Sequence, residues 1–150
     1  MNRRNSSTNN RILLDTSFLL PILGFETSNE IMKAFHKLSL YELYYSDISL
    51  LEALWKIAKT IKGSKEEIAR IKEGIKALRS TAKQVNIEEE AVENTINMYK
   101  LGHKDIIDNL LYSIAKTGKL KLLTVDKSLI KFIEKHEPSK ENIIHPKELK

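Results

Sequence analysis

The amino-acid sequence predicts an α/β protein in which helices cover both faces of a central, mostly parallel sheet. Short apolar or aromatic segments, typical of buried strands, alternate along the chain with longer segments whose apolar residues recur at helical spacing. Two of the short segments, "RILLD" at 11–15 and "KLKLLTVD" at 119–126, end in an aspartate. Because ligands bind beyond the carboxyl ends of the strands in open parallel sheets, these two aspartates are candidates for a functional site.

The residues that begin and end each segment predict the individual elements. Two capping boxes, Thr27 with Glu30 and Ser64 with Glu67, open helices, and Gly63 ends another. The aromatic run "YELYYSD" ends in polar residues, which suits a strand that leads into a helix. In chain order we expect strand 11–15, helix 28–38, strand 41–47, helices 48–63, 64–82, 86–102 and 103–118, strand 119–126, helix 127–136 and strand 142–146.

Length and composition favour one soluble domain over residues 11–150, preceded by a polar, flexible tail over residues 1–10. The chain has 150 residues, of which 41% are hydrophobic. No apolar run approaches the roughly 18 to 20 residues needed to span a bilayer. The opening "MNRRNSSTNNR" lacks the apolar core of a secretory signal, so we expect a cytoplasmic protein.

Charge and cysteine content narrow the chemistry. The chain has no cysteine, which excludes disulfides, thiolate metal sites and cysteine nucleophiles. The histidines show no His-x-x-x-His spacing, so a zinc hydrolase is not supported. A net charge of +5 and a pI near 9.3 favour a polyanionic partner such as nucleic acid, although charge alone does not establish one.

Acidic residues from distant parts of the chain are the candidates for chemistry. Asp15 and Asp126 follow strands and should share one edge of the sheet, although each also suits a helix N-cap. Asp105 and Asp108 lie three residues apart near the start of one helix, where the helix dipole favours acids in any case. Glu52 lies in the helix over 48–63, facing either solvent or a groove. The apolar stripe of that helix comprises Leu51, Leu54, Trp55, Ala58 and Ile61.

Converging carboxylates repel one another unless cations neutralise them. Mg²⁺ and Mn²⁺ accept such oxygen ligands, and Mg²⁺ commonly binds substrate phosphate as well. One or two such ions can activate a water for attack on phosphorus and stabilise the leaving oxygen. The combination of acids therefore suits hydrolysis of a phosphodiester, with the basic surface holding the polyanion.

Three segments resemble the PIN-domain nucleases, and among them the VapC toxins of VapBC toxin-antitoxin pairs. They are "LLDTSFLL" around Asp15, "SLLEALWKIA" around Glu52, and "DNLLYSIAKTGKLKLLTVDKSL", which contains Asp108 and ends in the family's Thr-x-Asp pattern at Thr124 and Asp126. The resemblance covers the chain from about Arg11 to Pro146. It implies a three-layer α/β/α sandwich, an endoribonuclease dependent on Mg²⁺ or Mn²⁺, a homodimer and an antitoxin partner.

The resemblance also implies roles for single residues. Asp15, Glu52 and Asp108 would be the metal-binding, catalytic acids, and Asp126 would complete the cluster directly or through water. The accessory residues would be Thr124 or Ser17, orienting a ligand or a water, and Asp105, either as an extra ligand or as a surface residue. The charged helical segment over 64–100 would form a clip over the substrate groove. Lys72, Lys76, Arg79 and Lys83 would then contact phosphate, unless they only solvate a helix surface.

Two other functions stay open at this point. A non-catalytic RNA-binding module of the same fold would bind RNA without metal, although such a module gains nothing from acids that face phosphate. A small phosphohydrolase of the haloacid dehalogenase type would need an Asp-x-Asp pair at the first strand, and "DTS" supplies only Asp15.

Overall fold

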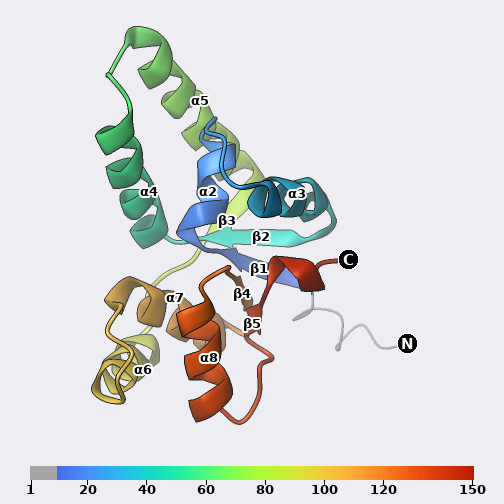
Figure 1. Cartoon of the computed structure of the whole chain (residues 1–150), viewed down its shortest axis with the longest axis vertical. Coiled ribbons are helices and arrows are strands. Elements are labelled where there is room, and N and C mark those ends of the chain that lie inside the picture. Colours follow the sequence, from blue (N-terminus) through green and yellow to red (C-terminus); the bar gives the residue numbers. More distant parts are fainter. Residues whose placement is uncertain (1–9) are drawn as a thin grey trace.

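The computed structural model describes residues 10–150, so nearly all of the flexible tail predicted for residues 1–10 lies outside the described residues. Figure 1 shows helices on two sides of a central sheet. The strands are β1 (Arg11–Leu14), β2 (Glu42–Tyr45), β3 (Ala82–Gln84), β4 (Lys121–Leu123) and β5 (Ile143–Ile144). Every strand pair in this sheet is parallel, and the spatial order is β3-β2-β1-β4-β5.

The sheet separates two hydrophobic cores, because successive side chains of a strand point to opposite faces. Leu14 of β1 packs into one core and Leu13 into the other. The first core is covered by α2 (Thr16–Ile22), α3 (Asn29–Lys37), α4 (Asp47–Thr60) and α5 (Lys65–Thr81). The second is covered by α6 (Glu89–Lys100), α7 (Ile106–Gly118) and α8 (Lys127–His136). The predicted three-layer α/β/α architecture is therefore confirmed.

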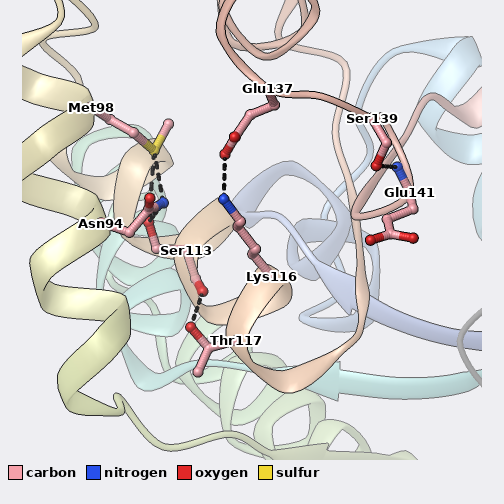
Figure 2. Close-up of polar contacts among 8 residues, drawn as sticks. All are labelled: Asn94, Met98, Ser113, Lys116, Thr117, Glu137, Ser139 and Glu141. Carbon is pink, nitrogen blue, oxygen red and sulfur yellow. Dashed lines mark hydrogen bonds and ion pairs between the residues drawn. The ribbon is translucent and has the colours of Figure 1, made fainter.

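Polar contacts hold α7 against its neighbours in the second layer (Figure 2). Asn94 of α6 donates a hydrogen bond of 2.8 Å to the hydroxyl of Ser113, which is fully buried on α7. Lys116, near the end of α7, forms an ion pair of 2.9 Å with Glu137, which follows α8. These contacts fix the position of the helix that carries Asp108.

Two elements of the sheet and its first layer were absent from the sequence prediction. Helix α2 is short, contains Pro21 and is apolar on most sides, so it lacks the periodicity that reveals longer helices. Strand β3 has three residues, of which Ala82 alone is buried, and it runs directly on from α5. The segment 64–100, in which two helices separated by a short gap were expected, thus also contributes an edge strand. Its helix α6 packs against α7, as part of the second layer.

The apolar stripe expected on α4 coincides only in part with its buried face, because Leu54 and Ile61 pack against the first core. Leu50, Ala53 and Ile57 face the first core, whereas Leu51 and Trp55 are 64% and 63% exposed. The helix carries two apolar stripes, and the sequence alone does not say which of them packs against the sheet. None of the helices within residues 10–150 is long and apolar enough to cross a membrane.

Candidate active site

A cleft of about 220 Å³ lies where β1 and β4 end. Asp15 directly follows β1, and Asp126 follows β4 after two residues. Helix α4 adds Glu52, and the beginning of α7 adds Asp105 and Asp108. The structure thus brings all five candidate acids to one cleft, whose lining is Asp15, Thr16, Ser17, Glu52, Lys56, Asp105, Asp108, Val125 and Asp126.

Asp15 lies at the buried floor of the cleft, with 7% of its surface exposed. It is the N-cap of α2, where one carboxylate oxygen accepts a hydrogen bond of 2.7 Å from the amide of Thr16. The other oxygen accepts a bond of 3.0 Å from the hydroxyl of Thr124. Burial, reinforced by the charge of Glu52, raises the pKa of Asp15 to about 6 despite these hydrogen bonds.

Thr124 joins the two strand-end acids. While donating to Asp15, its hydroxyl oxygen accepts a hydrogen bond of 3.1 Å from the backbone amide of Asp126. Thr124 is fully buried and does not line the cleft, whereas Ser17 does. Of the two residues named as possible orienting groups, Thr124 therefore contacts the acids from the protein interior. Ser17 lines the cleft, where a ligand would lie.

The carboxyl groups of Asp108 and Asp126 interact with each other, close to the charge of Asp15. Burial raises the pKa of Asp108 to about 9, and hydrogen bonding with Asp126 and the charge of Asp15 act in the same direction. Burial opposes ionisation of Asp126, but hydrogen bonds from Asp108 and from the amide of Leu129 outweigh it and lower its pKa. At neutral pH the pair therefore shares one proton, which sits on Asp108.

Helix capping and a place in the cleft turn out to be compatible. Asp126 caps α8 through a hydrogen bond of 3.1 Å from the amide of Leu129, and it still lines the cleft. Asp105 caps α7 through a bond of 3.1 Å from the amide of Asp108, and its side chain is exposed at the edge of the cleft. With Asp15 on α2, the cleft collects the N-termini of three helices, whose dipoles favour negative charge.

Glu52 and Lys56 form the α4 side of the cleft. Their charged groups lie 3.9 Å apart, one helical turn from each other, with side chains that are 23% and 54% exposed respectively. Lys56 is the one basic side chain among the residues that line the cleft, against five acids. Sequence reasoning missed it, although its position four residues after Glu52 is a spacing at which helix side chains meet.

His103 and Asn109 flank Asp105 and Asp108 in the sequence. The amide oxygen of Asn109 is hydrogen-bonded with Nδ1 of the His103 ring. The amide nitrogen of Asn109 donates a hydrogen bond of 2.6 Å to the backbone carbonyl of His103. Both residues are buried, and the His103 ring packs against Phe132 with centroids 5.4 Å apart. This arrangement fixes the loop that leads into α7, immediately before Asp105 and Asp108.

The donor set fits a hard divalent cation in chemical type and in charge. Carboxylates are the ligands that Mg²⁺ and Mn²⁺ prefer, and the cleft is lined by five acids and one lysine. Burial, with a smaller contribution from neighbouring carboxylates, raises the pKa of Asp15 and Asp108. Within residues 10–150, no three acids or histidines already converge closely enough to form a finished ligand set. Binding of a cation would therefore draw the side chains inward and displace the proton shared by Asp108 and Asp126.

Comparisons with known proteins identify the family and the fold. The family model of the PIN domain matches residues 12–135. A chain of a toxin-antitoxin complex from Klebsiella pneumoniae has the same fold, with a TM-score of 0.62, 19% identity, and coverage of 90% of this chain and 97% of that one. The structure of FitAcB from Neisseria gonorrhoeae gives a TM-score of 0.66 at 16% identity, covering 92% of this chain and 99% of that one.

A third structure, VapBC2 from Rickettsia felis bound to a DNA fragment from its promoter, gives a TM-score of 0.60 at 18% identity, covering 90% of this chain and 96% of that one. No curated protein sequence matches significantly. The structural likenesses concern the fold, whereas the family model spans most of the chain together with the strand ends and helices that carry the acids. The chain therefore belongs to the PIN-domain family.

Proposed function

We propose that this protein is a metal-dependent endoribonuclease, which acts as the toxin of a VapBC-type pair or as an RNA-processing nuclease. PIN domains are generally nucleases. The observation that carries the proposal is the convergence of five acids on one cleft at the carboxyl edge of the sheet, two of them with raised pKa. A site of this composition is costly to the free protein and becomes favourable when a cation enters it.

Asp15, Glu52 and Asp108 are the proposed ligands of Mg²⁺ or Mn²⁺, and Asp126 completes the set directly or through water. When bound, the ion supplies charge stabilisation to the phosphate and assists ionisation of the attacking water. Thr124 keeps the carboxylate of Asp15 in one orientation through its hydrogen bond of 3.0 Å. Hydrogen bonds lower the pKa of Asp126, which favours its ionised form and so the negative charge that it would offer to a cation.

The proposal also includes two protein partners, an antitoxin and a second copy of the chain. The structural relatives include toxin-antitoxin complexes, which supports an antitoxin as the partner of this chain. We propose a homodimer on the basis of the family resemblance, and a cytoplasmic location stays a prediction. Sedimentation of the purified protein tests the dimer. Co-expression with the product of a neighbouring gene tests the antitoxin, which should form a stable complex and suppress RNA cleavage.

Cleavage of a panel of labelled RNAs tests the nuclease directly. Wild type is compared with Asp15→Asn, each in Mg²⁺, Mn²⁺ or EDTA. Asp47→Asn is the matched control, because Asp47 is an exposed aspartate of α4 outside the cleft. We expect cleavage that needs metal, disappears in Asp15→Asn and persists in Asp47→Asn. RNA binding without cleavage and without any effect of EDTA would instead favour the non-catalytic binding module.

A further inference from the structure

Trp55 and Leu51 are the large apolar residues of α4 that are mostly exposed. Trp55 is the single tryptophan of the chain, and 63% of its surface is exposed although the first core lies against the opposite face of the same helix. Leu51, one turn earlier, is 64% exposed. Neither side chain serves the packing of the described fold, so their exposure calls for another explanation.

The position of Trp55 links it to the cleft. It directly precedes Lys56, which lines the cleft, and lies three residues after Glu52. The ammonium group of Lys59 lies 4.9 Å from the centroid of the indole ring, so this face carries a second positive charge. Lys56 is held only by its loose contact of 3.9 Å with Glu52, which leaves its charge available to another anion.

Charge indicates which partner suits this face. An exposed indole flanked by lysines matches a nucleotide, whose base stacks on the ring while its phosphates meet the ammonium groups. The exposed large apolar residues of this helix are Leu51 and Trp55, and lysines accompany them. The beginning of helix α6 differs, because its exposed Val92 lies beside Glu89 and Glu93, which repel a polyanion.

The cleft itself needs such an anchor. Five acids against one lysine repel the phosphates of a substrate until a cation is bound, so affinity for RNA has to come from outside the acid cluster. We propose that Trp55, Lys56 and Lys59, together called the α4 platform, bind a nucleotide of single-stranded RNA at the edge of the cleft. Trp55 stacks on its base, and the two lysines contact its phosphates. This inference rests on the proposed nuclease function, whose substrate the platform would hold.

The fluorescence of Trp55 provides the test, because no other tryptophan contributes to the emission. Full-length Asp15→Asn protein in Mg²⁺ is titrated with single-stranded oligouridylate and oligoadenylate, and with a double-stranded RNA of equal length. We expect saturable quenching by the single strands, and weaker quenching by the duplex, whose bases are already stacked. RNA that binds by polarisation while the emission of Trp55 stays unchanged would overturn the inference.

Variants separate stacking from charge. Trp55→Ala should weaken binding of single-stranded RNA about 5- to 100-fold, and Trp55→Phe should recover most of the affinity. Lys56→Met and Lys59→Met should each lower the slope of log affinity against log salt concentration by about 0.7. Leu51→Ala is the matched control, since it removes an equally exposed apolar side chain without a π face. Equal affinity of Trp55→Ala and wild type would refute the role of the platform.

The remaining outcomes distinguish this inference from the function on which it rests. If wild type cleaves RNA but Trp55→Ala binds and cleaves it equally well, the platform is refuted and the nuclease stands. If wild type neither binds nor cleaves any RNA, both fail. If Trp55 emission shifts with protein concentration alone, and both Trp55→Ala and Leu51→Ala sediment as smaller species, a second copy of the chain covers this face, which overturns the RNA platform.

Discussion

The floor of the cleft, formed by Asp15 and Asp108, and its rim, formed by Glu52 and Lys56, differ in how far their side chains are buried and in what holds them in place. At the floor, Asp15 and Asp108 are buried, are held by hydrogen bonds and have raised pKa values. At the rim, Glu52 and Lys56 are partly exposed and joined only by a contact of 3.9 Å. The floor follows from the fold, because parallel strand ends and helix N-termini meet there, whereas the rim depends on surface side chains of one helix. The proposed metal ligands thus come from both parts, with Asp15 and Asp108 held by the fold and Glu52 held only by its place on one helix.

The contrast is sharpest for two acids of the same helix turn. Asp108→Asn should lower RNA cleavage at least about 100-fold, because the amide cannot lose a proton to become the carboxylate ligand proposed for the cation. Asp105→Asn, an exposed cap that asparagine replaces well, should retain activity within about tenfold. Cleavage rates of the two variants are measured under saturating Mg²⁺. An equal loss of cleavage activity in both variants would contradict the distinction between the buried and the exposed acids.

Replacing the floor acid Asp15 should stabilise the metal-free protein. The pKa of Asp15 rises from 3.8 to about 6 on folding, so the folded state holds its proton more tightly and the protein loses stability as pH rises through this window. Asp15→Asn abolishes that loss, and its free energy of unfolding at pH 7 in EDTA should exceed that of wild type by up to about 3 kcal/mol. Urea titrations at pH 4 and pH 7 measure the gain, which should be nearly absent at pH 4.

The bridge between the strand ends should matter less than the acids but remain measurable. Thr124→Val keeps the shape of the side chain and leaves Asp15 and the amide of Asp126 without their shared partner. We expect a loss of about 1 to 3 kcal/mol in unfolding free energy, together with slower cleavage. Thr124→Ser restores the hydroxyl and should recover both properties. A valine variant that is as stable and as active as wild type would show that the bridge has no effect.

The smallest effect on stability is expected at the rim. Glu52→Gln removes a partly exposed carboxylate with a weak ion pair, so the unfolding free energy should stay within about 0.5 kcal/mol of the wild-type value. Its cleavage activity should nevertheless fall strongly if Glu52 is a metal ligand. The combination of unchanged unfolding and lost activity would mark Glu52 as a purely functional acid, unlike Asp15.

The sequence predicted the meeting of distant acids because a simple rule governs it. Carboxyl ends of parallel strands lie on one edge of the sheet, so the sequence predicts that Asp15 and Asp126 share that edge. The rule does not predict the contacts of side chains whose neighbours depend on tertiary packing. The hydroxyl of Thr124 could therefore not be distinguished from that of Ser17, and Lys56 was overlooked.

Helix α4 shows the same limit in the fold. Its two apolar stripes are equally consistent with burial in a sequence pattern, and only packing against the sheet selects Leu50, Ala53 and Ile57. Trp55 is consequently expected in the core and found on the surface. Helix α2 and strand β3 escaped prediction for a related reason, because seven and three residues carry too little periodicity to be recognised.

Calorimetric titration with Mn²⁺ tests the central claim most directly, which is that the acids of the cleft hold a divalent cation. The account predicts that wild type binds Mn²⁺ at pH 7 and releases about one proton, because the proton shared by Asp108 and Asp126 has to leave. Repeating the titration in buffers of different ionisation enthalpy counts the protons, and Asp15→Asn should bind far more weakly than Asp47→Asn. Absence of Mn²⁺ binding by wild type, or equal binding by these two variants, would contradict the account.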